Sequence, residues 1–215
     1  CLALIYAILA RWAASDVRDS TTYMAFYLLL GLAWLGLCAR LMHLGGISPR
    51  DDVVERRNPA AAWAVAGGLL AVALCYAGGN IGDGPGWWVV VFAAGLATAA
   101  LGLIGGFVAA AGRLAERITV ERELAGGVRY GCLLVACGLI LGRAVAGDWV
   151  SAAATVTDFA VVARPVFVLA AIEVILGRTL LITGGSIFAA IAVGLLPGCG
   201  YLFAAGAYVA QQGLG

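Results

Sequence analysis

The chain has 215 residues, of which 63% are hydrophobic and only 12% are charged, and its mean hydropathy is +1.01. Soluble domains carry about 25% charged and about 45–50% apolar residues, so this composition excludes a soluble enzyme fold and indicates an integral membrane protein. The formal net charge of +1 provides no basic field that would attract nucleic acid.

Cysteine and histidine usage argues against a metal site. The six cysteines lie within or beside apolar runs and form no CxxC pair, and His43 is the single histidine of the chain. Zinc, haem and iron–sulfur sites need closer groups of such ligands. We therefore expect no metal and no cofactor. The sequence also contains no nucleophilic triad and no phosphate-binding loop, so we expect that the protein is not an enzyme.

An apolar run at residues 1–14 opens the chain. It is shorter than the roughly 20 residues that a bilayer span requires. We interpret it as the second half of a spanning helix, a remnant of a preceding helix; a lipid-modified N-terminus at Cys1 is the alternative.

Six further apolar runs are long enough to cross the bilayer, and they lie at residues 22–41, 59–81, 87–111, 124–146, 152–177 and 180–210. In the last run Pro197 lies among three glycines, so we expect a kink or a break there, with a re-entrant feature as the alternative. The sequence predicts an all-α, polytopic transmembrane bundle of about six full helices plus an N-terminal partial helix, in a single membrane domain over residues 1–215.

The arginines set the expected topology. All 13 basic residues are arginines, and eight of them follow the first, third and fifth full helices: Arg40, Arg50, Arg56, Arg57, Arg113, Arg117, Arg122 and Arg178. The positive-inside rule places these junctions in the cytoplasm. The opposite turns, around Asp83 and Asp148, contain no arginine and are flanked by tryptophans typical of a membrane interface.

The chain also repeats a pattern of one inward helix, a charged cytoplasmic turn and one outward helix, over residues 22–82, 87–147 and 152–210. Gly67 lies nine residues after Asn58. Gly131 lies nine residues after Arg122, and the first two outward helices both finish at a Gly-Asp pair. Units of the same orientation are related by an axis along the membrane normal. We therefore expect tandem parallel two-helix repeats.

Residues 50–62 (RDDVVERRNPAAA), followed by a helix through Gly67 and Gly68, resemble the opening of the bacterial domain-of-unknown-function 350 family. The stretch from Glu123 through Gly131 to Gly147 resembles the partner copy of that repeat, with Arg122 or Glu123 in place of the family's second asparagine. The resemblance is best over about residues 22–148. It implies a multi-pass bacterial inner-membrane protein built of tandem two-helix units, and it supplies no established activity and no catalytic residues.

Five ionisable residues fall inside the predicted spans: Arg129, Arg143, Asp158, Arg164 and Glu173. Such a group costs about 2.5–3.5 kcal/mol at a helix centre, so it usually faces the bundle interior and has a partner. The fourth helix runs outward and the fifth inward. The matching depths therefore predict two interhelical pairs, Arg129 with Glu173 and Arg143 with Asp158.

Arg164 has no predicted partner and precedes Pro165, whose ring frees a carbonyl one turn back. Arg164 could donate to that carbonyl or coordinate an anion. Under one hypothesis, all five charges form a buried network that locks the fifth helix to the fourth. Under the other, Arg164 lines a polar path for an ion, a proton or a small anionic solute, together with Asp158 or Glu173.

Small residues and one asparagine predict local packing. Glycines four residues apart allow helix backbones to approach closely, within or between protomers, and they occur as Gly102/Gly106, Gly127/Gly131 and Gly138/Gly142. Asn58 precedes Pro59 and an alanine run, which is the pattern of a helix N-cap.

Two functions fit these features. The first is a channel or transporter-like subunit that moves an ion or small solute through a helical bundle. The alternative is a non-transporting scaffold, or a subunit of a larger membrane complex, that docks partners through cytoplasmic turns such as residues 48–58. In both cases we expect the lipid bilayer and other membrane subunits or a second copy of the chain as partners, and no nucleic acid.

Overall fold

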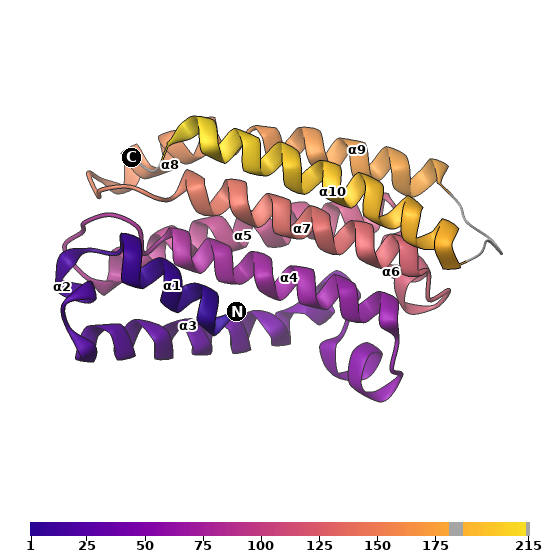
Figure 1. Cartoon of the computed structure of the whole chain (residues 1–215), viewed down its shortest axis with the longest axis horizontal. Coiled ribbons are helices and arrows are strands. Elements are labelled where there is room, and N and C mark those ends of the chain that lie inside the picture. The colour runs from indigo at the N-terminus through magenta and orange to yellow at the C-terminus, as the bar shows by residue number, and fades with distance from the viewer. Residues whose placement is uncertain (181–186, 214–215) are drawn as a thin grey trace.

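The helices of the computed structural model lie side by side along one long axis (Figure 1), and the structure describes residues 1–180 and 187–213. In chain order they are α1 (Leu2–Trp12), α2 (Ser15–Arg18), α3 (Thr21–Leu41), α4 (Pro59–Gly78), α5 (Trp87–Ala111), α6 (Leu114–Thr119), α7 (Leu124–Ala144), α8 (Ala152–Val162), α9 (Pro165–Thr179) and α10 (Ile187–Gln212). A 3₁₀ turn, η1 (Met42–Gly45), and a π-helical segment, η2 (Pro49–Glu55), lie between α3 and α4.

Five of the described helices are long and apolar enough to cross a membrane, and the bent pair of α8 and α9 supplies a sixth if it counts as one span. The predicted all-α polytopic bundle is therefore confirmed, and the protein is an integral membrane protein. The predicted last helix began at residue 180; residues 181–186 lie outside the described part of the chain, and α10 begins at Ile187.

The position of the helix break differs from the prediction. Residues 152–177 were expected to form one helix, but α8 and α9 are separate and meet at an angle of 44°. Pro165 has no N–H and cannot continue the hydrogen-bond ladder of α8. The hydroxyl of Tyr208 in α10 donates to the carbonyl of Val162 at 3.0 Å, which satisfies a backbone acceptor at the break. At Pro197 the helix does not break, because α10 continues through that residue, and the expected kink there stays a prediction.

Helices α4 and α7 run in the same direction with their backbones in contact. A Cβ atom on Gly67 would lie 2.3 Å from the carbonyl oxygen of Gly131, and one on Gly78 would lie 2.2 Å from that of Gly142. Contacting positions advance together along both helices, so the helices are parallel. Contact this close is possible only where side chains are missing.

Helices α10 and α1 run in the same direction as α4 and α7. A Cβ on Gly194 of α10 would lie 3.0 Å from the Ala125 carbonyl oxygen, and one on Gly198 would lie 3.0 Å from the Cys132 Cβ, so α10 advances in parallel with α7. The amide of Gly82, beyond the end of α4, donates to the carbonyl of Trp12 at the end of α1 (3.4 Å). Figure 1 shows α10, α7 and α4 in succession, with α5 and α9 behind them.

Burial shows where the core lies. In the most apolar window of α4 and of α7, 67% and 78% of the residues are buried, compared with 17% in the span that contains α3. The glycine pairs Gly127/Gly131 and Gly138/Gly142 face the α4 backbone. By contrast, a Cβ atom added to Gly102 or Gly106 in α5 would have no contact within 4 Å among the described residues. The central seam is therefore α4 against α7, and α3 lies outside this seam, against α1 and α4.

Gly131→Ala is expected to destabilise the protein by about 1–3 kcal/mol, the usual cost of overpacking, because its Cβ would lie 2.5 Å from the Trp63 carbonyl oxygen. The matched control is Gly102→Ala, which enters open space in α5 and should be neutral or stabilising by up to about 1 kcal/mol. Denaturant unfolding in detergent measures both variants. Equal effects at the two positions would contradict the close α4–α7 contact.

Candidate functional site

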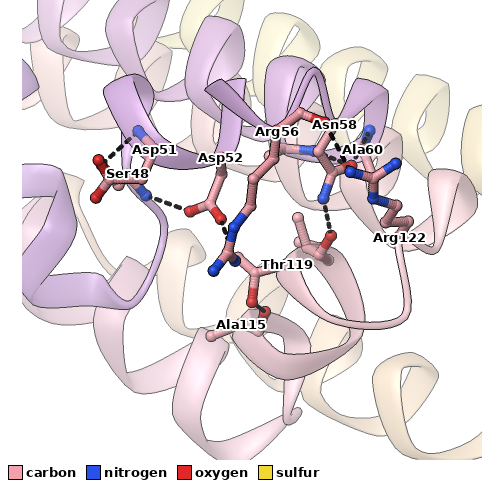
Figure 2. A network of polar contacts seen from close by, with 11 residues as sticks. Ser48, Asp51, Asp52, Arg56, Asn58, Ala60, Ala115, Thr119 and Arg122 are labelled. Carbon is pink, nitrogen blue, oxygen red and sulfur yellow. Dashed lines mark hydrogen bonds and ion pairs between the residues drawn. The ribbon is translucent and has the colours of Figure 1, made fainter. Parts of the chain in front are cut away.

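The turn before α4 is held by its own side chains (Figure 2). The hydroxyl of Ser48 accepts from the amide of Asp51 at 3.1 Å, and the amide of Ser48 donates to the carboxylate of Asp52 at 2.7 Å. This reciprocal pairing satisfies amides at the start of η2 in the manner of a capping box. Asp52 is buried and also pairs with Arg56 at 3.2 Å. The turn is therefore a defined structure, as a docking surface needs.

Asn58 connects this turn to the next one. Its side-chain oxygen accepts from the amides of Ala60 (3.0 Å) and Ala61 (3.3 Å), so the predicted N-cap of α4 is confirmed. Its side-chain amide donates to the carbonyl of Ile118 at 2.7 Å, at the end of α6. Sequence reasoning identified the cap but not the second contact, because the proximity of Ile118 depends on the packing of α4 against α7.

At the turn before α7, an ion pair connects neighbouring segments as Asn58 does at the turn before α4. Glu123 is the N-cap residue of α7, but a carboxylate has no N–H to donate. Arg117 lies 2.6 Å from it and donates to the carbonyls of Gly177 and Leu180, the latter at 2.9 Å. Both side chains are nearly fully buried. Arg117 therefore caps the C-terminus of α9 and connects the turn before α7 to the turn after α9, as Asn58 connects the turn before α4 to the turn before α7.

Other arginines at this end also bind backbone carbonyls. Arg122 donates to the carbonyl of Arg56 at 2.6 Å (Figure 2), and Arg178 donates to that of Ala111 at the end of α5 at 2.9 Å. Cations are favoured at helix C-termini because the last carbonyls are unsatisfied. Arg113 pairs instead with Glu116, whose hydrogen bond and charge raise the pKa of the Arg113 guanidinium. Several arginines of the arginine-rich turns thus connect neighbouring segments of the chain through hydrogen bonds to backbone carbonyls.

Arg129 and Glu173 form a fully buried ion pair between α7 and α9. The Nε atom of Arg129 lies 2.8 and 2.9 Å from the two carboxylate oxygens of Glu173, and both side chains are 0% exposed. Tyr201 of α10 donates its hydroxyl to the same carboxylate at 2.8 Å. The expected pair is present, and Tyr201 is an additional member that the sequence did not reveal. Both terminal nitrogens of Arg129 are buried without a hydrogen-bond partner among the described residues.

Arg143 does not pair with Asp158, so this expected pair is wrong. Its guanidinium donates to the carbonyls of Gln212 (3.2 Å) and Gly213 (2.5 Å) at the end of α10, and to that of Ala146 at 3.2 Å. Arg143 therefore caps α10 from the neighbouring parallel helix. Equal depth was insufficient to predict a pair, because the direction in which α8 faces was unknown.

The side chains of Asp158 and Arg164, in the bent pair of α8 and α9, are both exposed in this chain. Within the described part of the chain neither side chain makes a hydrogen bond or an ion pair, and α8 has no buried residue. Among the described residues the Arg164 side chain also donates to no carbonyl at the break: the Val161 carbonyl accepts from the Arg164 backbone amide at 3.4 Å, and Tyr208 supplies the donor to Val162. The expected single network of five charges is therefore wrong: two are buried together, one caps a helix and two face outward.

Two hollows lie at opposite ends of the bundle. One hollow lies where α1, α4 and α7 end, and its lining includes the polar side chains of Asp16, Tyr27 and Asn80. The other is lined by Gly112, Arg113, Glu116, Arg117, Glu121, Gly177 and Arg178. Arg164 lines neither of these hollows. Sequence reasoning did not identify the first hollow, because the turns that form it are brought together by tertiary contacts.

Comparison with known proteins gives one match. The family model described as Domain of Unknown Function (DUF350) matches residues 15–145. This is the family that residues 50–62 resemble, and the match confirms the resemblance. The curated proteins and the solved structures gave no match.

The Arg129–Glu173 pair gives a double-mutant prediction. Arg129→Met or Glu173→Leu alone should cost about 3–5 kcal/mol, because each leaves a buried charge without its partner. The double variant should recover most of that loss, since well-packed apolar replacements of a buried pair are often neutral. Denaturant unfolding of the four proteins in detergent measures the coupling. Additive losses in the double variant would show that the two side chains do not interact.

Proposed function

Since this chain belongs to the DUF350 family, we propose that it is a structural subunit of a larger membrane assembly, without catalytic activity of its own. We place it in the bacterial inner membrane with the arginine-rich turns in the cytoplasm, following the positive-inside rule. In this proposal its helices form a rigid support, its outer surface contacts other membrane proteins, and its cytoplasmic turns are available for docking.

The observation that carries the proposal is the outward position of Asp158 and Arg164 in the α8–α9 span. An Asp or Arg at the centre of a spanning helix costs about 2.5–3.5 kcal/mol in lipid. A protein surface that supplies partners would remove that cost. The charges therefore favour a subunit whose α8–α9 face is covered by protein over a chain surrounded by lipid.

The packing of the interior supports the same role. The α4 and α7 backbones touch at Gly67 and at Gly78, and α10 lies close against α7 at Gly194. The buried Arg117 and the half-buried Arg143 both bind carbonyls at helix ends. These contacts occupy the central seam that a solute path through one chain would need.

We also propose that the chain is built of tandem units. Two contacts recur at nearly the same sequence separation: Asp83 with Asp148 at 65 residues and Arg56 with Arg122 at 66 residues. The parallel course of α4 and α7 is what units of equal orientation would produce. Each additional unit of such a repeat would widen the helical bundle by one helix pair.

A second candidate function is transport, favoured by the unpartnered nitrogens of Arg129. Ionisable groups inside the membrane often mark ion or proton pathways. Proton flux into vesicles reconstituted with the purified protein tests this candidate. Flux above that of protein-free vesicles, lost in Glu173→Gln, would support transport; flux equal to that of protein-free vesicles would support the structural role.

The proposed cover on α8–α9 predicts protection from lipid. A fluorescent label at Phe167→Cys, which leaves Asp158 and Arg164 intact, should be quenched weakly by nitroxide-labelled lipids in native membranes, because protein covers this exposed position. The matched control is Leu103→Cys on α5, where the native side chain is 76% exposed and should face lipid. Cys1 and Cys199, the exposed native cysteines, are replaced by alanine in both samples. Equal quenching at the two positions would refute the structural-subunit proposal.

A further inference from the structure

We propose that the protein covering the α8–α9 face is a second copy of this chain, with Asp158 of each copy paired to Arg164 of the other. The inference rests on the structural-subunit role and identifies its partner. It follows from the presence of both charge signs on one exposed span. A partner carrying a single charge would satisfy only one of them, whereas a two-fold contact satisfies both, because residue i meets j and j meets i.

The depths of the two residues are compatible with this arrangement. Copies with the same orientation share a two-fold axis along the membrane normal, so contacting groups must lie at similar depth. Six residues of straight helix rise about 9 Å. The 44° angle between α8 and α9 requires at least one of them to tilt from the membrane normal, and a tilt of α8 would shorten that separation along the normal; Arg164 stands at the break itself. The long arginine side chain can cover the remainder by extending along the apolar surface.

The surroundings of the charges suit a protein contact. Val156 and Val161 on α8 are 45% and 50% exposed, and Phe167 and Val168 on α9 are 63% and 61% exposed. These side chains flank Asp158 and Arg164 along the chain and would exclude lipid and water around the pairs. An ion pair removed from water interacts more strongly than an exposed one, provided that both partners are present.

Charge exchange between copies tests the inference. Two differently tagged copies are co-expressed, and the amount of one that co-purifies with the other in mild detergent is measured. Asp158→Arg in both copies, or Arg164→Asp in both copies, should lower co-purification about tenfold, because like charges then face each other. Co-expression of the Asp158→Arg copy with the Arg164→Asp copy should restore it, since each contact again joins opposite charges.

The same experiment includes its controls. Thermal unfolding of each single variant shows whether the chain still folds, and the mixed pair provides internal proof because it contains the same two variants. Recovery in the mixed pair would support the inference. Recovery only when both changes are in one chain would place the pair within a single copy and overturn it. Self-association that none of the changes affects would overturn it as well.

The quenching measurement separates this inference from the structural-subunit role. If Phe167→Cys is shielded from lipid but the two tagged copies do not associate, another protein covers the face; the second-copy inference then fails and the structural-subunit role stands. If Phe167→Cys is quenched like Leu103→Cys, both fail.

Discussion

The structure depends on backbone contact between α4 and α7. Where a side chain on Gly67 or Gly78 would stand, the carbonyl of Gly131 or Gly142 lies instead. This contact fixes the parallel register of the two helices. It therefore brings Asn58 to Ile118 at one end and the amide of Asp83 to the carboxylate of Asp148, 2.8 Å away, at the other. The glycines at the α4–α7 contact are therefore required for the hydrogen bonds at both ends of these two helices.

A second constraint is the need to satisfy helix ends in and near the membrane. Exposed backbone carbonyls are costly where water is scarce, and the chain meets this cost with side chains from neighbouring helices. Arg143 caps α10, Arg117 caps α9, and Tyr208 supplies a donor at the α8–α9 break. Each such link joins two helices as well as closing one end, so the polar groups add rigidity. Asp158 and Arg164 differ because they bind nothing within the described chain.

Sequence reasoning predicted what depends on local order or on depth alone. The Asn58 cap follows from neighbouring residues, and the Arg129–Glu173 contact follows from matching depths on adjacent helices. It did not predict features that depend on how helices are rotated. The direction of α8 separated Arg143 from Asp158, and Tyr201 could not be assigned to Glu173 before α10 was placed. Pro165 breaks its helix whereas Pro197 does not, a difference that composition around the two prolines does not contain.

The most direct test of the central claim is a pair of distances between spin labels on the turns that flank α4 and α7. Labels at Glu55 and Glu121 report one end of the bundle, and labels at Asp83 and Asp148 report the other. Parallel helices in backbone contact predict strong dipolar broadening for both pairs. An antiparallel arrangement would separate each pair by about the length of a 20-residue helix, roughly 30 Å. Weak broadening at either end would contradict the account.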